Sequence, residues 1–373
     1  MTYCLRCILH DGIPGVVIGP AGICNYCDLH DEWDRDNNPD HGQQWLNVVY
    51  QEMRRERTGE YDCIVGISGG ADSSYVLAML VDYGLNPLAV HWDNNWNTKI
   101  ANENIRKLVQ GLGVDLYRVG ITAIEYNDLC RSFLLASTPD ADIPNDIALA
   151  TVLYQACEIF DCKYIVNAHC FRTEGTTPLG WTYMDGGYIE NVHKEFGRWG
   201  LSKYPNLTYD LFKKYIELGI QRIRPLWSIN YNKFTAIKDL ENRFGWRWYG
   251  SHHAENTYTI FVGSFLWRVK FRMDLRYVEY SALVRSGFMS REKAVKEIGK
   301  PPKYNATLPF VVRSRLKMTK DEWDQMMVAP VKSYLDYGNY QDRFKADRKF
   351  FDAAMGRGLI PETFYRKYVL GVQ

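Results

Sequence analysis

The stretch YDCIVGISGGADSSYVLAMLVDY, residues 61–83, decides the fold of this chain. Its first part, 61–67, is a short apolar run rich in β-branched residues, which is typical of a buried strand. A Ser-Gly-Gly turn at 68–70 then allows unusual backbone angles, and Asp72 opens a helix-start signal followed by apolar residues at helical spacing. A strand, a glycine turn and a helix start direct several backbone N–H groups at one point. We therefore expect an anion-binding site, and phosphate is the anion that this geometry favours.

The loop sequence SGGADS, residues 68–73, matches neither G-x-x-x-x-G-K-[ST] nor G-x-G-x-x-G. It resembles instead the pyrophosphate loop (PP-loop) of ATP pyrophosphatases, enzymes that split ATP into AMP and pyrophosphate. Asp72 supports the resemblance, because a carboxylate beside phosphates requires a cation between them, and Mg²⁺ binds through one or two carboxylates plus substrate phosphates. The alternative is an ordinary strand-to-helix turn in which Ser and Asp side chains cap the helix.

Length and composition indicate an ordinary globular protein. The chain has 373 residues, 46% of them apolar, with 45 basic and 44 acidic side chains, so it can form two domains or one large one. The balanced charge argues against a protein that acts on nucleic acid. No apolar run approaches the roughly 18 residues of a membrane span, so we expect no membrane partner and a cytoplasmic location.

Four of the nine cysteines form two C-x-x-C hooks, Cys4 with Cys7 and Cys24 with Cys27. Four thiolates at this spacing can close a tetrahedral Zn²⁺ site, so residues 1–30 are predicted to be a structural zinc ribbon. An iron–sulfur cluster and plain buried thiols are the alternatives. The other five cysteines are scattered and odd in number, which is typical of a reducing compartment.

From residue 61 onward predicted strands alternate with helices, which indicates an α/β fold with a doubly wound parallel sheet. We predict a connecting helix within 31–60, a PP-loop domain over 61–250 and a C-terminal helical region over 251–373 that serves substrate binding or homodimer formation. The predicted strands are 61–67, 86–92, 114–119 and 163–168, with helices at 99–112 and 147–160. The segment 171–227 is rich in loops and aromatic residues, as expected of a substrate-binding insertion.

Ligands of such sheets bind beyond the carboxyl ends of the strands. The predicted ends carry polar and aromatic side chains suited to phosphate, adenine and ribose, although each taken singly is equally suited to packing or loop capping. The candidate nucleotide-binding residues are Ser68, Gly69, Gly70, Asp72, Ser73, Ser74, His91, Trp92, Asp93, Asn167, His169 and Glu174. A second constellation, His252, His253 and Glu255, can bind metal or move protons near neutral pH. Asp140, Asp142 and Asp146 are either metal ligands or helix-start residues.

Several of these pieces occur together, in the same order, in one family. The chain resembles the N-acetyl sugar amidotransferases of bacterial surface-glycan biosynthesis, a branch of the PP-loop ATP pyrophosphatases. The matching stretches span almost the whole chain: the two cysteine hooks, YDCIVGISGGADSSY, PLAVHWDNNWNT, DIPNDIALATVLYQA, the TEG at 173–175, FGWRWYGSHHAENTYTIF and SALVRSGFMSREKA. The family often has lysine where this chain has Ala71.

The resemblance implies an activity: ATP and ammonia convert a sugar's acetamido group into an acetamidino group, releasing AMP and pyrophosphate. The acceptor is an acetamido sugar or sugar nucleotide. The implied cofactors are ATP and Mg²⁺, with structural Zn²⁺ at the cysteines. Asp72 and Ser73 would act at the phosphates, with Asp72 on Mg²⁺, and His252, His253 and Glu255 would lie near the acceptor.

No cysteine has the sequence context of a glutaminase nucleophile, so ammonia is expected from a separate glutaminase subunit or from solution. Two rival functions remain open at this stage. A tRNA thiolation enzyme would use Cys170 as a sulfur carrier, and a nucleotide-binding scaffold would have lost turnover with the cation at Ala71.

Overall fold

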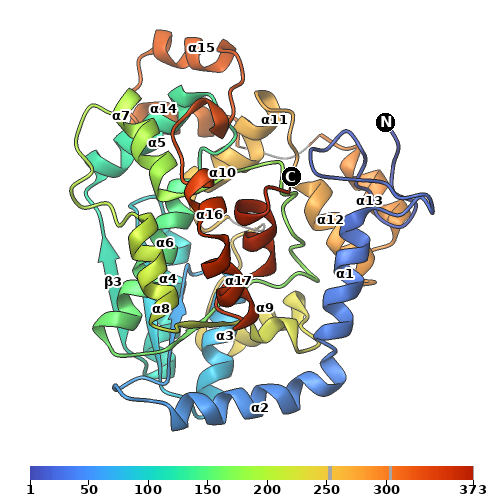
Figure 1. The fold of residues 1–373 in the computed structure, drawn as a ribbon, viewed down its shortest axis with the longest axis vertical. Helices are drawn as coiled ribbons and strands as arrows, with labels where there is room; N and C mark the ends of the chain where they lie inside the picture. Colours follow the sequence, from blue (N-terminus) through green and yellow to red (C-terminus); the bar gives the residue numbers. More distant parts are fainter. Residues whose placement is uncertain (251–253, 302–304, 373) are drawn as a thin grey trace.

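Five parallel strands form the central sheet of the computed structural model, which describes residues 1–250, 254–301 and 305–372 (Figure 1). The strand order is β3-β2-β1-β4-β5, so the chain runs from the centre to one edge and then crosses back to the other. The strands are β1 (Cys63–Gly66), β2 (Pro87–Asp93), β3 (Leu116–Gly120), β4 (Tyr164–Val166) and β5 (Gln221–Ile223). The first four lie within the predicted runs or within a residue of their ends.

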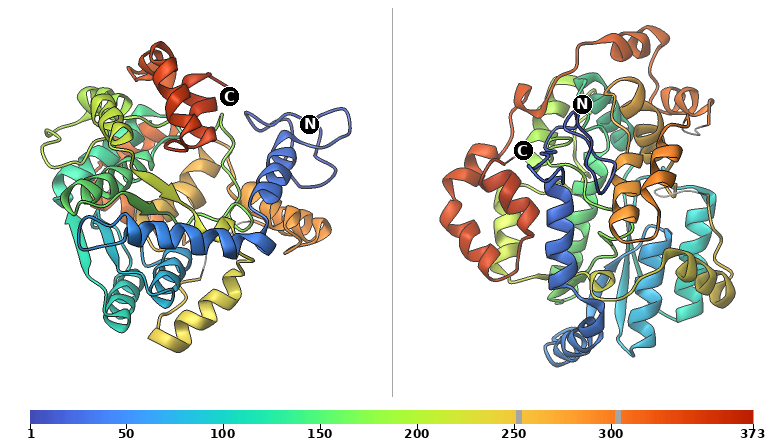
Figure 2. Two further views of the ribbon diagram at one scale, coloured as in Figure 1. Left: turned by 60° about the horizontal axis from the view of Figure 1, so that its bottom comes forward. Right: turned by 90° about the vertical axis from the view of Figure 1, so that its right-hand side faces the viewer.

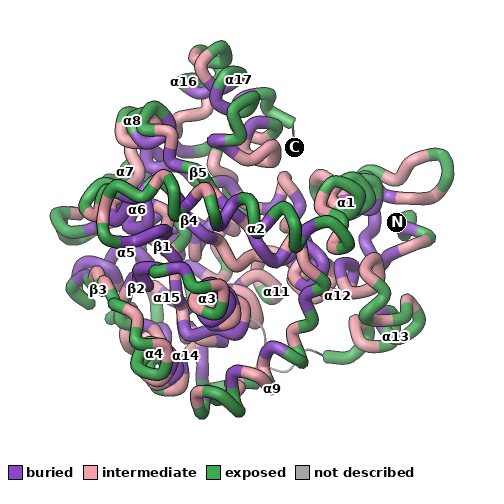
Figure 3. The backbone as a smooth tube through the Cα atoms, turned by 90° about the horizontal axis from the view of Figure 1, so that it is seen from below, coloured by how far each residue is buried: buried purple, intermediate pink, exposed green. Residues whose placement is uncertain are grey.

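Helices cover both faces of the sheet, which confirms the doubly wound α/β architecture. One face carries α3 (Ala71–Asp82), α4 (Lys99–Leu112) and α9 (Lys233–Phe244), and the other carries α5 (Ala123–Ala136), α6 (Ile143–Ile159) and α7 (Gly186–Phe196). Alternation along β1 shows the two layers, because Val65 belongs to the core under α3 whereas Ile64 belongs to the core under α6. The three inner strands, β1, β2 and β4, are buried between these layers, whereas the edge strands β3 and β5 are partly exposed, as are the outer faces of the helices (Figure 3).

The N-terminal connection differs from the single helix predicted within 31–60. The structure has two helices there, α1 (Asn25–Asp36) and α2 (Pro39–Arg55). Pro39 stands at the first position of α2, where its missing N–H costs nothing, and the side chain of Asn38 caps this helix by accepting from the N–H of Asp40. The same proline cannot continue α1, so the chain bends at this point.

The segment 171–227 is also more regular than predicted. It is irregular to Asp185 and then contains α7, α8 (Tyr209–Glu217), β5 and the short helix η1 (Pro225–Trp227). β5 is a three-residue edge strand whose register is fixed by pairing with β4, Tyr164 opposite Gln221. A strand this short has too few positions for a period-two signal, which explains why the sequence did not indicate it.

The C-terminal region is helical, as predicted. Its elements are α10 (Thr257–Phe261), η2 (Val262–Leu266), α11 (Trp267–Val269), α12 (Arg276–Arg285), α13 (Arg291–Ile298), α14 (Leu308–Arg315), α15 (Lys320–Val328), η3 (Tyr334–Asp336), α16 (Gln341–Ala346), α17 (Arg348–Gly356), α18 (Glu362–Phe364) and η4 (Tyr365–Val369). Helices α16 and α17 pack back against α8, where Tyr209 and Phe344 have ring centroids 5.4 Å apart. The N-terminal ribbon lies beside α12 and α13 (Figure 2).

Candidate active site

The loop between β1 and α3 is shaped as a turn over which a phosphate can lie. Gly69 has φ +84°, and a Cβ atom at this position would lie 2.4 Å from the carbonyl oxygen of Ala101. Only glycine fits here. The N-cap of α3 is Gly70, which has no side chain to cap the helix, and the hydroxyl of Tyr249 accepts from the N–H of Ala71 at 3.3 Å. The start of the helix therefore faces the site with its positive dipole end.

Asp72 does not cap the helix either, which removes the ordinary-turn alternative. Its Oδ2 accepts a hydrogen bond from Lys233 Nζ at 2.6 Å, and its Oδ1 accepts one from the Tyr231 hydroxyl at 2.5 Å. Burial raises the pKa of Asp72, but the Lys233 charge and both hydrogen bonds outweigh it and hold the pKa below the ordinary value. Burial lowers the pKa of Lys233, yet the charges of Asp72 and Glu174 outweigh it and raise the pKa. The two residues are thus an ion pair beside the loop.

The serines of the loop meet the C-terminal region at Glu255. Ser68 Oγ donates to Glu255 Oε1 at 3.3 Å, and the N–H of Ser68 donates to Ser73 Oγ at 3.4 Å. Glu255 therefore lies at the PP-loop itself. The other two members of the predicted constellation, His252 and His253, lie outside the described residues.

The remaining predicted loop residue, Ser74, is buried beneath the loop and does not line the cavity. Its backbone N–H donates to the carbonyl of Gly70 within the first turn of α3. Ser74 thus belongs to the packing of the helix, because the fourth position of a helix turns away from the anion at its start.

The end of β2 differs from the predicted nucleotide-binding surface. Trp92 is a core residue, 5% exposed, with its ring edge-on to Tyr126 at 6.1 Å. Asp93 forms an ion pair with Arg118 on β3. The residues near the end of β2 that line the cavity are His91, Trp92, Asn94 and Asn97. Asp93 is not among the residues that line the cavity.

His91 supports the loop from below. Its Nδ1 lies 2.8 Å from the carbonyl oxygen of Ile67, the residue before the loop, and its Nε2 lies 3.4 Å from Asn97 Nδ2. A carbonyl accepts only, so Nδ1 carries the proton and Nε2 accepts. Burial lowers the pKa of His91, which keeps the ring neutral.

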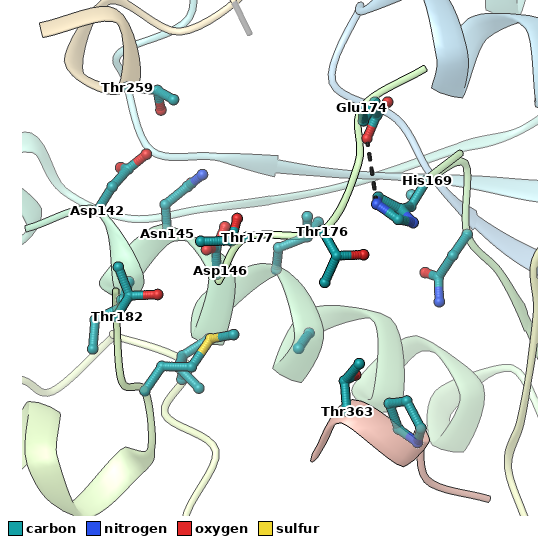
Figure 4. Close-up of a pocket in the computed structure, with 18 of the residues that line it drawn as sticks. Asp142, Asn145, Asp146, His169, Glu174, Thr176, Thr177, Thr182, Thr259 and Thr363 are labelled. Atoms are coloured by element: carbon teal, nitrogen blue, oxygen red, sulfur yellow. Dashed lines mark ion pairs between the residues drawn. The ribbon is translucent and has the colours of Figure 1, made fainter. Parts of the chain in front are cut away.

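Beyond β4, the residues Asn167, His169 and Glu174 all line the cavity. His169 Nε2 donates to the carbonyl of Gly175 at 2.9 Å and lies 3.9 Å from Glu174 Oε2, as Figure 4 shows. Cys170 is fully buried, and burial raises the pKa of its thiol to about 11. A protonated, buried thiol is a poor nucleophile, so the structure gives no support to Cys170 as a sulfur carrier.

These groups open into one cavity of about 1040 Å³. Part of its wall is rich in hydroxyl, amide and carboxyl side chains (Figure 4): Asp142, Asn145, Asp146, Thr176, Thr177, Thr182, Thr259 and Thr363. Asn94 Nδ2 donates to Asn145 Oδ1 at 2.8 Å and its Oδ1 accepts from Asn256 at 3.0 Å, which ties β2, α6 and the start of α10 together. Asp140 is buried, which raises its pKa to about 6, and it accepts from the N–H of Tyr183 at 2.7 Å.

Sequence reasoning missed five residues of the cavity or of the loop's surroundings. They are Tyr231, Lys233, Tyr249 and two arginines, Arg222 within β5 and Arg224 directly after it. One signal was available for Lys233: the loop position at which the family often has lysine holds Ala71, so a cation from elsewhere was to be expected. For the arginines the signal was two like charges at alternate positions in QRIRP, which places both on one side of a strand.

The four predicted metal ligands form one buried cluster whose sulfur atoms all lie within 4.8 Å of one another. The Cys4–Cys27 and Cys7–Cys24 Sγ distances are 3.7 and 3.6 Å. A tetrahedral ion with Zn–S bonds of about 2.3 Å places its sulfurs about 3.8 Å apart, so the donor set fits zinc. Arg285 of α12 donates to Cys27 Sγ and Cys7 Sγ, each at 3.4 Å, and thus offsets thiolate charge. Within the described residues this is the one group of three or more such side chains that could hold a metal.

The ribbon and α1 hold the wall of the cavity. The Tyr26 hydroxyl accepts from the N–H of Leu179 at 2.8 Å, and Arg172 Nε donates to Asp34 Oδ1 at 2.7 Å. Trp181 packs in the same small core as the four cysteines. The segment 174–182, which carries cavity residues, is therefore positioned by the cysteine cluster.

Among the described residues, no helix is both long enough and apolar enough to cross a membrane.

An uncharacterized protein of Methanocaldococcus jannaschii is 25% identical over 250 residues, covering 66% of this chain and 76% of that protein. An NH3-dependent NAD synthetase from Campylobacter jejuni has 13% identity and a TM-score of 0.31, covering 73% of this chain and 99% of its own. An NMN synthetase from Francisella tularensis has 14% identity and a TM-score of 0.26, and the match covers 58% of this chain and 99% of the synthetase.

The family comparison concerns the region that begins at the loop-contacting glutamate. Residues 255–350 match the model of the C-terminal domain of WbpG-like LPS biosynthesis proteins. This domain supplies Glu255, Asn256 and Thr259 to the cavity. The match supports the predicted family, since residues 255–350 are similar to the C-terminal domain of WbpG-like LPS biosynthesis proteins.

Proposed function

We propose that this chain is an ATP-dependent amidotransferase that converts the acetamido group of an N-acetylated, nucleotide-activated sugar into an acetamidino group, releasing AMP and pyrophosphate. One observation carries the proposal. A single cavity joins the glycine turn and its Asp72–Lys233 pair to a chamber rich in hydroxyl, amide and carboxyl groups. The first part suits the phosphates of ATP, and the second suits a sugar.

The chemistry explains why ATP is required. An amide carbonyl is a poor electrophile, and its oxygen is a poor leaving group. Attack of the amide oxygen on the α-phosphorus forms an O–P bond, breaks the bond to pyrophosphate and leaves an O-adenylyl imidate. Ammonia then adds to the imidate carbon, the C–O bond breaks with its electron pair leaving on AMP, and a proton is lost to give the amidine.

The residues of the loop contribute binding and charge stabilisation, as in phosphoryl transfer generally. The N–H groups and hydroxyls around Ser68, Gly70 and Ser73 would hold the departing pyrophosphate. Asp72, and Glu174 beside it, are the carboxylates that would hold Mg²⁺, which neutralises phosphate charge when bound. Lys233 lies against the same carboxylate and supplies the positive charge that Ala71 does not.

Glu255 is proposed as the group that accepts the proton of the incoming nitrogen, since its carboxylate lies in the cavity at the loop. His252 and His253 keep their predicted place beside it as part of the proposal. Ammonia is proposed to come from a separate glutaminase subunit, one of the two sources predicted from the sequence. At the β2 end, His91, Trp92, Asn94 and Asn97 line the cavity and Asp93 does not, so the first four are the residues proposed to lie nearest the nucleotide.

The test is AMP and pyrophosphate release by the full chain with Mg²⁺-ATP and ammonium, against a panel of nucleotide-activated acetamido sugars. Mass spectrometry of each acceptor looks for the replacement of oxygen by NH. We expect acceptor-dependent release that Asp72→Asn abolishes and that Asp82→Asn, at the exposed end of the same helix, leaves unchanged. Release that depends on tRNA instead, or ATP binding with no turnover on any acetamido sugar, would contradict the proposal.

A further inference from the structure

Two arginines line the cavity, one within the edge strand β5 and one directly after it. Arg222 lies within β5 and Arg224 directly follows it, so both side chains project to the same side of the strand. Across the described residues, neither guanidinium forms an ion pair or a hydrogen bond to a carboxylate. The Nε of Arg222 is buried with no hydrogen-bond partner.

Aromatic rings hold both guanidinium groups in place. Arg222 lies over the ring of Tyr154 on α6 at 4.8 Å, and Arg224 lies over the ring of Trp227 at 4.8 Å. Tyr154 is itself stacked on Tyr215 at 4.7 Å, and Trp227 Nε1 donates to His169 Nδ1 at 3.4 Å. Stacking fixes the planes of the two forks but leaves their N–H donors available to a ligand.

Such an arrangement is unfavourable for the protein alone. Burial and the neighbouring charge of Arg222 lower the pKa of Arg224 to about 10, so Arg224 remains protonated at neutral pH. Two like charges lie close together, partly removed from water, and no acidic side chain of the described residues pairs with them. An anion bound between them would offset this cost, and function is a common reason for local destabilisation.

The pair is distinct from the PP-loop. β5 is two strands away from β1, so at about 4.8 Å per strand the ends of the two strands are about 10 Å apart. A cavity of about 1040 Å³ is at the upper end of the size found for single ligands, which leaves room for ATP and a second molecule.

We propose that Arg222 and Arg224 bind the two linked phosphates of a nucleotide-activated sugar, and so select a diphosphate-bearing acceptor. Each planar fork can bind one phosphate through two parallel hydrogen bonds, so the pair matches a diphosphate better than a single charge. This inference rests on the proposed function for the identity of the acceptor, but the anion site itself can be tested without turnover.

The binding test uses inorganic pyrophosphate, which resembles both the leaving group of ATP and the diphosphate of a sugar nucleotide. Titration calorimetry of the full chain with Mg²⁺ is expected to show two sites in the wild type. The Arg222→Gln/Arg224→Gln variant should retain one site, and Arg106→Gln, on the exposed face of α4, should retain two. Equal stoichiometry and affinity in all three proteins would overturn the inference. The variant should melt no lower than the wild type, since it removes unpaired buried charge.

The turnover test compares acceptors. For UDP-N-acetylglucosamine or another active sugar nucleotide, Arg224→Gln should raise KM by about 10- to 100-fold, as expected for a lost charge-assisted contact, with KM for ATP unchanged. A raised KM for ATP would assign the arginines to the ATP site. An equal rise in KM for a neutral acetamido sugar, which has no phosphate, would also overturn the diphosphate assignment. So would a rise in KM seen only with acetamido uronic acids, because their negative charge is a carboxylate. If no acetamido sugar leads to AMP release, the proposed function is rejected but the anion site is not. The number of pyrophosphate molecules bound by the wild type and the variant then still tests the anion site.

Discussion

Lys233 Nζ lies 2.6 Å from Asp72 Oδ2, although the two residues are 161 positions apart in the chain. Asp72 follows β1 in the PP-loop, whereas Lys233 opens α9 after the last strand. The pair brings a positive charge to a loop that itself has alanine at position 71. If this charge stabilises departing pyrophosphate, it lowers the free energy of the transition state more than that of bound ATP.

Replacing Lys233 with methionine should therefore reduce the rate of AMP formation by about 100-fold or more, with a smaller change in KM for ATP. The matched control is Lys238→Met on the exposed side of the same helix, which should keep full activity. Initial rates of pyrophosphate release measure both variants. Equal rates in the wild type and Lys233→Met would show that the lysine is only a structural partner of Asp72.

Gly69→Ala should disrupt the loop, because φ +84° strains alanine and its Cβ would lie 2.4 Å from the Ala101 carbonyl oxygen. We expect a loss of about 3 kcal/mol in the free energy of unfolding and loss of ATP turnover. Gly113→Ala is the matched control: its φ is +65°, but nothing lies within 4 Å of its Cβ position, so the loss should be about 1 kcal/mol with activity kept. Urea unfolding compares the two, and similar losses would contradict the close contact.

His91 should make stability depend on acid pH. Its pKa is lowered in the folded protein by burial, so below the unfolded value of about 6.5 the unfolded chain binds a proton that the folded chain does not. The stability due to the neutral ring is thus complete above about pH 6.5 and declines as the pH falls toward the folded pKa. Urea unfolding at pH 8 and pH 5 should show a smaller decline for His91→Asn than for the wild type. His41→Asn, at an exposed position, should decline like the wild type.

Removing the metal from the four-cysteine cluster should loosen a cavity wall that lies outside the ribbon. Tyr26 and Trp181 connect the cluster to segment 174–182, so chelation should speed amide hydrogen exchange there as well as in residues 1–30. Exchange in β1 and α3 should change little. Added Zn²⁺ should restore protection and activity together. Unchanged exchange in 174–182 after complete metal removal would show that the ribbon does not position the wall.

The sequence by itself determined those features of this protein that depend on residues close together in the chain. The alternation of β-branched runs and helical spacing predicted the parallel sheet, since periods of 2.0 and 3.6 are local properties. The Ser-Gly-Gly turn placed the phosphate loop, because few other residues adopt φ near +84°. The paired hooks predicted the cluster of four cysteines, because ligand spacing restricts which residues can converge on one ion.

Tertiary structure alone decided which side chains meet. Asp93 was predicted to face a nucleotide, but it pairs with Arg118 of the edge strand β3 and does not line the cavity; Trp92, which does line it, packs edge-on to Tyr126. Lys233 reaches Asp72, and Arg222 and Arg224 reach the cavity, only because β5 pairs with β4 and α9 packs on α3. These contacts join segments far apart in the chain, and their register is fixed by packing and hydrogen bonding over the whole sheet, for which no short stretch of sequence carries a signal.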